Sequence, residues 1–286
     1  MMTSFAPSGA HWAPLTSRAT LALSGPEWRG YLQGLVTQDV ETLAPGELRF
    51  AALLTPQGRL LFDLFLLGRE GMGREDGCLI DCAAEHQGAL LQRLKMYRLR
   101  AKVEIAEENA AVWALWGLEA APAGWARDPR APGLGFRGYG LTPPETGVAA
   151  GEDEAAYEAH RLALGVPGPA DWGHDRSYPI EANFDLLGGI DFRKGCFVGQ
   201  ETTSRMKRRG TIKNRMAPIA VDGPRPAAGA PLLSGELRAG QVSSSSQAGA
   251  MALLRLDRLG EGPLTLEDGR AWRVAWPEWM KAEVSG

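Results

Sequence analysis

The chain has 286 residues, of which 44% are hydrophobic and 23% are charged, and its formal net charge is −3 at pH 7. This balance is typical of globular proteins and argues against long disordered segments and against a membrane-embedded body. No stretch reaches the roughly 18 apolar residues that a membrane-spanning helix needs, and the N-terminal residues lack a basic start followed by an apolar run. We therefore expect a cytoplasmic protein of two or three domains with no membrane partner.

Uniformly apolar or alternating runs predict strands at 19–23, 48–54, 60–67, 78–82 and 101–105. The runs at 48–54 and 60–67 are joined by Thr55-Pro56-Gln57-Gly58, where proline fixes φ and glycine permits a positive φ, so they predict a hairpin. Apolar residues recur at helical spacing from Trp28 to Leu35 and again over 84–98. These elements predict an α+β layer of βαβ type.

A second layer begins with a predicted strand at 111–116 and includes a predicted helix at 153–164, with acids in its first turn. The intervening stretch 120–151 is rich in proline and glycine and shows no clear period. After Arg215 the sequence contains short β-like runs separated by glycine and proline, at 216–221, 231–233, 240–243, 250–254 and 271–274. Such spacing predicts a small barrel or sandwich. The predicted domains are 12–108, 109–214 and 215–286.

The three cysteines, Cys78, Cys82 and Cys196, are an odd number without CxxC spacing, which argues against a disulfide framework and against a four-thiolate metal site. Cys196 follows Lys194 by two residues and precedes a helix predicted at about 199–206. A nearby cation and a helix N-terminus both stabilise a thiolate, so Cys196 is a candidate reactive thiol. The alternative is a small buried side chain in a tight turn. Lys194 and Glu201 are likewise compatible with surface or capping roles.

Charge is unevenly distributed. The segment from Arg193 to Arg215 has eight basic residues, including Arg209, and one acid, so it carries +7 against −10 for the remainder. It is interpreted as a solvated face, as a surface whose cations contact the carboxylates of a ligand, or as an RNA-binding surface. Because it lacks a recognisable RNA-binding motif and interleaved aromatics, direct nucleic-acid binding is not expected.

The segment Lys194-Gly195-Cys196-Phe197-Val198-Gly199-Gln200-Glu201 resembles the K-G-C-[FY]-x-G-Q-E signature of the YgfZ family, with every fixed position filled. The resemblance extends to 31–40, 95–103, 179–192 and 240–244, and so covers the chain from about 19 to about 256. It implies an α+β fold of two ferredoxin-like layers of the aminomethyltransferase type and a C-terminal β-barrel around a central hole that binds tetrahydrofolate. It also implies a role in supporting iron–sulfur enzymes.

The related aminomethyltransferases use a pattern like G-x-x-x-D-D-L, of which Gly58 to Leu64 retains the second acid, Asp63. Their R-L-E-A-G element supplies a glutamate that holds the pterin ring, whereas this chain has Ala163 at that position. Loss of a charged hydrogen bond weakens orientation by about 1.5–3 kcal/mol, which harms group transfer more than binding. We therefore do not expect an aminomethyltransferase.

The leading hypothesis is a tetrahydrofolate-binding accessory protein that supports iron–sulfur cluster assembly or repair in client enzymes, including those that modify tRNA. The resemblance implies catalytic roles for Cys196, Lys194 and Asp63, and folate contacts for Tyr157, Gly195, Gln200, Glu201 and Arg205. No metal ligands are expected, because three scattered cysteines cannot hold a stable cluster, so any cluster contact is transient and uses Cys196. One alternative is a folate-dependent one-carbon transferase of the aminomethyltransferase type. Another is a module that stores folate or scaffolds a partner.

Overall fold

The structure is a computed structural model that describes residues 9–70, 76–141, 150–208, 210, 212–246 and 249–284. Arg209 of the basic segment and the first eight residues lie outside this set. The chain divides into two compact units, which are described separately. Unit 1 comprises Met1–Trp28, Thr42–Arg49 and Phe65–Tyr157, and unit 2 comprises Arg29–Glu41, Phe50–Leu64 and Glu158–Gly286.

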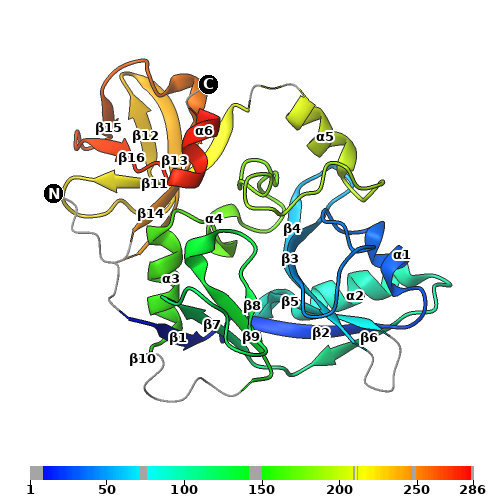
Figure 1. The fold of residues 1–286 in the computed structure, drawn as a ribbon. Coiled ribbons are helices and arrows are strands. Elements are labelled where there is room, and N and C mark those ends of the chain that lie inside the picture. Colours follow the sequence, from blue (N-terminus) through cyan, green and yellow to red (C-terminus); the bar gives the residue numbers. More distant parts are fainter. Residues whose placement is uncertain are drawn as a thin grey trace. The chain divides into compact units, whose positions relative to one another are not determined.

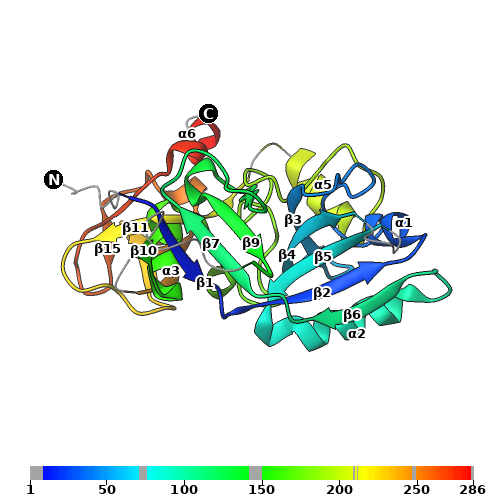
Figure 2. The ribbon, with the colours of Figure 1, turned by 60° about the horizontal axis from the view of Figure 1, so that its bottom comes forward.

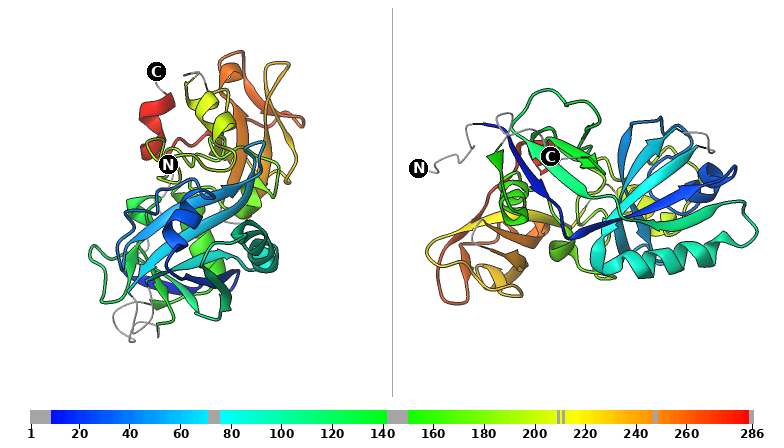
Figure 3. Two further views of the ribbon diagram at one scale, coloured as in Figure 1. Left: turned by 90° about the vertical axis from the view of Figure 1, so that its right-hand side faces the viewer. Right: turned by 90° about the horizontal axis from the view of Figure 1, so that it is seen from below.

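The first sheet has the strand order β3-β4-β5-β2-β6, and its strands are β3 (Leu48–Leu54), β4 (Leu60–Arg69), β5 (Gly77–Ala83), β2 (Arg18–Ser24) and β6 (Glu104–Glu108). Strands β5 and β6 both pair antiparallel with β2, so they run parallel to each other. They are connected by η1 (Ala84–His86) and by α2 (Gln87–Arg98), which lies along the face of β2 and β6 (Figures 2 and 3). This arrangement confirms the predicted βαβ layer.

The second sheet has the order β10-β1-β7-β9-β8, with β10 (Ala150–Gly151), β1 (His11–Pro14), β7 (Val112–Trp116), β9 (Phe136–Tyr139) and β8 (Ala126–Arg127). Helix α3 (Glu154–Ala163) follows β10, and η2 (Pro132–Leu134) precedes β9. One face of this sheet buries a small core made of Ala13, Leu15, Val112, Ala114, Trp116 and Tyr157. The stretch 120–151 therefore contains short strands despite its lack of a sequence period.

A buried ionic network joins strands of both sheets within unit 1. Asp81 accepts hydrogen bonds from Arg18 Nε at 2.6 Å and from Arg137 Nη1 at 2.8 Å. Asp128 accepts from Arg130 Nη2 at 2.7 Å and from Arg137 Nε at 3.2 Å. Burial alone would raise the pKa of Asp128, but the charges and hydrogen bonds of Arg130 and Arg137 outweigh this effect and lower the pKa to about 2.

The C-terminal sheet, in unit 2, is drawn in yellow to red in Figure 1, and its strand order is β15-β12-β13-β14-β11-β16. Its strands are β11 (Asn214–Val221), β12 (Pro231–Ser234), β13 (Leu237–Ser245), β14 (Ala250–Arg255), β15 (Leu264–Leu266) and β16 (Trp272–Val274). The two outer strands meet through a bridge between Thr265 and Ala271, which nearly closes a six-stranded barrel. The predicted barrel is confirmed. Segment η3 (Leu256–Arg258) follows β14, and α6 (Glu278–Val284) follows β16.

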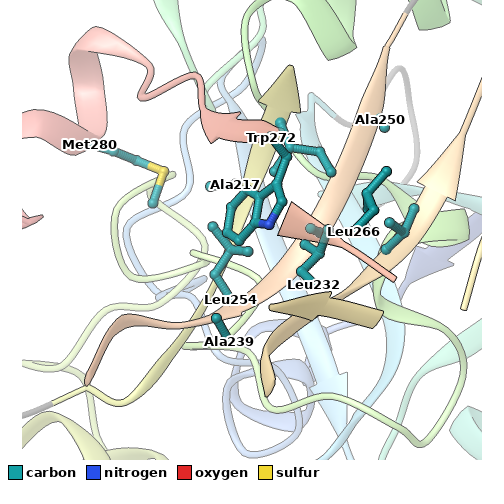
Figure 4. Packing of buried hydrophobic residues seen from close by; sticks show 11 residues of the cluster. Ala217, Leu232, Ala239, Ala250, Leu254, Leu266, Trp272 and Met280 are labelled. Carbon is teal, nitrogen blue, oxygen red and sulfur yellow. The ribbon is translucent and has the colours of Figure 1, made fainter. Parts of the chain in front are cut away.

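The barrel core is built around the indole of Trp272, which lies among the small and branched side chains of Ala217, Leu232, Leu254 and Leu266 (Figure 4). The indole Nε1 donates to the carbonyl oxygen of Leu233 at 3.1 Å, so this buried donor is satisfied.

The described residues also form the helices α1 (Trp28–Gln33), α4 (Pro169–Trp172) and α5 (Gln200–Arg208). The chain between α4 and α5 is irregular and contains the signature segment. Across the residues that the structure describes, no helix is long and apolar enough to cross a membrane.

Candidate functional site

The signature loop, defined as residues 188–199, is attached to the end of α1 by the side chain of Lys194. Its Nζ atom donates to the carbonyl oxygens of Gln33, Val36 and Gln38 at 2.8, 2.6 and 2.8 Å. The last carbonyls of a helix lack intrahelical partners, and the ammonium group satisfies Gln33 and two carbonyls of the following turn. An ammonium has three N–H donors, so this arrangement uses all of them.

Lys194 is only 9% exposed, and its ammonium also lies 5.4 Å from the centre of the Phe197 ring. Burial lowers the pKa of Lys194 to about 8, whereas the charges of Asp39, Asp191 and Glu41 favour the protonated form. Because every donor is engaged with the backbone, this geometry gives Lys194 the character of a structural clamp.

Further hydrogen bonds join the same two segments within unit 2. The hydroxyl of Thr37 donates to the carbonyl oxygen of Gly189 at 2.6 Å, and the backbone N–H of Asp191 donates to the carbonyl oxygen of Thr37 at 3.0 Å. The N–H of Val198 donates to the carbonyl oxygen of Gly34 at 3.2 Å. The signature loop is therefore held at both ends and by the Lys194 side chain.

Cys196 is exposed on this loop, whereas Cys78 and Cys82 are buried in β5. The structure thus excludes the interpretation of Cys196 as a buried packing residue. At the neighbouring Gly195, a side-chain methyl group would meet no described atom within 4 Å. The backbone at Gly195 and the thiol of Cys196 are therefore both accessible to a partner molecule.

Gly199 of the signature has a steric reason to be glycine. Its φ is +81°, and a Cβ atom would lie 2.7 Å from the carbonyl oxygen of Thr55 and 3.0 Å from the Cα of Gly58. Gly58 has a φ of +86°, and its own Cβ would lie 2.9 Å from Cβ of Thr202. The turn of the β3–β4 hairpin therefore packs directly on the start of α5, and two glycines make this approach possible.

A groove of about 570 Å³ lies along α5 and is lined by Phe192, Gln200, Glu201, Ser204, Lys207 and Arg208. The Phe192 ring is 37% exposed, and the Lys207 ammonium lies 5.9 Å from its centre. The volume falls in the usual range for small-molecule sites. An apolar ring next to cations suits a ligand or peptide with both an aromatic and an anionic part. Phe192 and Gln200 flank Cys196 in the sequence.

The basic segment does not form one solvated face. The guanidinium of Arg215 is buried, donates to both carboxylate oxygens of Asp185 at 2.8 and 2.9 Å, and also donates to the carbonyl oxygen of Ile180 at 3.0 Å. By contrast, Arg205 is half-exposed on α5 and lies 4.0 Å from Glu201. Arg215 is thus structural, while Arg205 and Glu201 are available at the surface.

Two predicted site residues, Asp63 and Tyr157, do not line the groove along α5. Asp63 is buried in β4 and is not part of the groove lining. Tyr157 belongs to unit 1, where it is 3% exposed, accepts a hydrogen bond from Arg130 at 2.9 Å and packs 5.8 Å from the Trp116 ring. Folate stacking on Tyr157 requires this packing to open. Within the described ranges, no group of three or more His, Cys, Asp or Glu residues is suited to hold a metal ion.

Residues 213–282 match the family described as CAF17, C-terminal beta-barrel domain. Human iron–sulfur cluster assembly factor IBA57, mitochondrial, is 31% identical to the chain over 95% of the chain and 86% of the human protein. The chain belongs to the IBA57/YgfZ/CAF17 family. The family membership predicted from the signature is therefore confirmed.

The IBA57 homologue of the fungus Coccidioides immitis is 34% identical over 74% of the chain, but the match covers only 57% of the fungal protein. The chain thus spans slightly more than half the length of that relative. Glycine cleavage system aminomethyltransferase T from Bartonella henselae has the same fold, with a TM-score of 0.76 at 17% identity over 95% of the chain and 86% of the enzyme. The predicted aminomethyltransferase-like α+β fold of this IBA57-family chain is confirmed.

The Thr37–Asp39 turn and the signature loop are both parts of the family resemblance, but the sequence alone does not predict that they contact each other. The groove residues Phe192 and Ser204 were not predicted as site residues, and Lys207 was considered only as one cation of the basic segment. The signal available for the groove was the recurrence of Gln200, Ser204 and Lys207 at helical spacing, which places them on one face of α5.

Proposed function

We propose that this IBA57-family chain is an accessory factor for the assembly or repair of iron–sulfur clusters. The observation that carries the proposal is the exposed thiol of Cys196 on a loop that Lys194 clamps to the end of α1. The human relative is itself named an iron–sulfur cluster assembly factor, which supports the same assignment. Client enzymes, including those that modify tRNA, are the partners that this function requires.

The chemistry of the site suits a shared and transient cluster contact. Thiolate is the form of cysteine that binds iron, and a cluster bound through cysteines needs four of them. Cys78 and Cys82 are buried, so Cys196 supplies one ligand and a client or partner protein supplies the others. The open backbone at Gly195 leaves room for that partner, while the Lys194 clamp holds the thiol in a fixed position.

We further propose that unit 2 binds tetrahydrofolate through Gly195, Gln200, Glu201 and Arg205, and the folate contact of Tyr157 in unit 1 stays a prediction. The aminomethyltransferase-like fold supports this proposal. Glu201 and Arg205 form an exposed pair at 4.0 Å, which contributes little to stability and leaves Arg205 able to turn to a carboxylate tail. Bound folate would supply a one-carbon carrier, and these residues would bind and orient it.

A one-carbon transferase is the second candidate, and the buried carboxyl group of Asp63 favours it. Ala163 argues against it, because no carboxylate occupies that position of α3. The neighbouring Arg161 is already engaged by Glu158 at 2.6 Å and by Asp171 at 3.1 Å. Helix α3 is thus stabilised by one ion pair within the helix and by another to α4.

Deletion of the gene from its source organism separates the two candidates. For an accessory factor, the activities of iron–sulfur enzymes and the tRNA modifications that depend on them fall, while growth on a one-carbon donor is unaffected. For a transferase, growth on the donor fails and iron–sulfur enzymes remain active. Calorimetry with tetrahydrofolate and with its methyl and formyl derivatives tests the folate proposal, which fails if none releases or absorbs heat at millimolar concentration. A cytoplasmic location stays a prediction.

A further inference from the structure

The end of α2 in unit 1 combines exposed cations with exposed apolar side chains. Five of the ten residues from Arg93 to Lys102 are basic and none is acidic. Met96 is 60% exposed and Leu99 is 87% exposed, and they are two of the four large hydrophobic side chains that the described residues expose. Lysine or arginine side chains lie on both sides of Leu99, and Arg98, Arg100 and Lys102 are all exposed.

Leu99 occupies a backbone conformation that glycine normally adopts. Its φ is +47° and its ψ is −107°, and the N–H of Ala101 donates to the carbonyl oxygen of Arg98 at 2.8 Å. These values correspond to the first central position of a type II′ turn, which glycine dominates because a side chain there is strained. A leucine that is both strained and exposed contributes nothing to the packing of unit 1. Its side chain is therefore accessible for contact with another molecule.

A cleft of about 730 Å³ adjoins the turn and is lined by Ser24, Gly25, Pro26, Arg98, Ala101, Lys102, Val103 and Glu104. The N–H of Lys102 donates to Glu27 at 2.8 Å, which fixes one wall of the cleft. Gly25 has a φ of +106°, and a Cβ atom there would lie 2.5 Å from the carbonyl oxygen of Lys102, so the two walls are in close contact. We call Met96, Leu99, the five cations and this cleft the α2-end surface.

We propose that the α2-end surface docks a partner protein through a segment that carries an apolar side chain flanked by carboxylates. Leu99 and Met96 meet the apolar side chain, and Lys95, Arg98 and Arg100 meet the carboxylates. An anionic membrane is a less suitable partner, because Glu27 and Glu104 lie at the cleft. The continuous negative charge of such a lipid surface would repel these two carboxylates. A protein segment can place its carboxylates opposite the cations and away from these glutamates. The proposal is independent of folate binding and of Cys196.

The first test is site-specific photo-crosslinking of the full-length protein in cells of its source organism. A benzophenone side chain is introduced at position 96 or 99, and at position 237 as a control, because Leu237 is a 46% exposed leucine in the barrel. The expected result is one discrete adduct with an acidic protein from positions 96 and 99 and none from position 237. Adducts only with lipid or with a second copy of the chain contradict the proposal, as does labelling no stronger than at position 237.

The second test titrates the captured protein, once purified, against wild-type protein and two variants. Leu99→Gly removes the apolar contact but suits the positive φ, so it should raise the Tm by roughly 2 °C while weakening the partner's Kd at least about tenfold. Arg98→Glu combined with Arg100→Glu should weaken the Kd by a similar factor and reduce its salt dependence. An unchanged Kd for the stable Leu99→Gly variant overturns the proposal. So does Leu99-dependent flotation with vesicles of phosphatidylcholine and phosphatidylserine.

Discussion

The Nζ atom of Lys194 lies 2.6 Å from the carbonyl oxygen of Val36, a residue 158 positions earlier in the chain. This contact joins the signature loop to the turn after α1, and two more carbonyl oxygens share the same ammonium group. Lys194 thus has a structural role, because its hydrogen bonds hold the loop that carries Cys196. A role as proton donor would need one of its three N–H groups to leave the backbone.

Lys194→Ala should loosen both segments that the clamp joins. It leaves three carbonyl oxygens without their charged donor, and we expect a loss of about 2–4 kcal/mol in the free energy of unfolding. Hydrogen exchange should increase at 33–39 and at 191–198. Arg193→Ala is the matched control, because that neighbouring side chain is 94% exposed and should change stability by less than about 0.5 kcal/mol. Equal exchange in the two variants would show that Lys194 does not act as a clamp.

Cys196 should react with iodoacetamide at least about tenfold faster than Cys78 or Cys82 in the native protein, because thiol reactivity requires access. Cys78 and Cys82 are 1% and 0% exposed, and both lie in a strand that is paired on either side. Mass spectrometry of peptides after timed labelling measures the three rates. Lys194→Ala should change the Cys196 rate more than Arg208→Ala does. Similar rates for the three thiols would contradict the exposed position of Cys196.

Asp63→Asn should leave iron–sulfur enzyme activity in cells nearly unchanged and should alter folate handling only modestly. The reason is that position 163 lacks the carboxylate with which the aminomethyltransferases hold the pterin ring. A one-carbon transfer assay measures the effect directly. A loss of more than about 100-fold, or roughly 2.7 kcal/mol of barrier, would instead identify Asp63 as an acid or base and favour the transferase.

Asp128→Asn should destabilise unit 1 and change its acid sensitivity. Because the pKa of Asp128 is about 2 in the folded chain and 3.8 ordinarily, its stabilising effect is complete above about pH 4 and is lost as the pH falls toward 2. The asparagine variant should therefore be less stable at pH 7, by about 3–5 kcal/mol, and should lose about 2 kcal/mol less between pH 4 and pH 2.

Urea unfolding at a series of pH values measures both quantities. Asp268→Asn is a suitable control, because that carboxylate pairs with Arg270 at the surface. If the free energy of unfolding depends on pH in the same way in wild-type and Asp128→Asn protein, protonation of Asp128 does not cause the loss of stability in acid.

Much of the fold could be predicted because its long strands and helices are strongly patterned. Strand β3 was predicted with its observed bounds, and β4, β5 and α2 within two or three residues, since their apolar residues face a core on one or both sides. Strand β6 begins at Glu104, three residues later than predicted, because the strained turn at Leu99 occupies the chain before it.

The strands of two or four residues in the second sheet could not be predicted in this way. Strand β1 joins the second sheet through antiparallel pairing with β7, far along the chain, and its sequence His11–Pro14 has no period of its own. The same holds for the site. The signature identified Lys194 and Cys196, but only the fold brings Lys194 to the carbonyl groups of Gln33, Val36 and Gln38, because no sequence pattern specifies which backbone oxygens a lysine reaches.

The most direct measurement is the activity of iron–sulfur enzymes in a deletion strain that carries either a Cys196→Ala or a Cys78→Ala allele, with protein levels quantified in parallel. Cys78 is the matched control, because it is a buried thiol that belongs to β5 and not to the signature loop. We predict that Cys78→Ala restores activity in proportion to its protein level, whereas Cys196→Ala accumulates normally and restores little or none. Full restoration by Cys196→Ala would contradict the proposal that the exposed thiol makes the cluster contact.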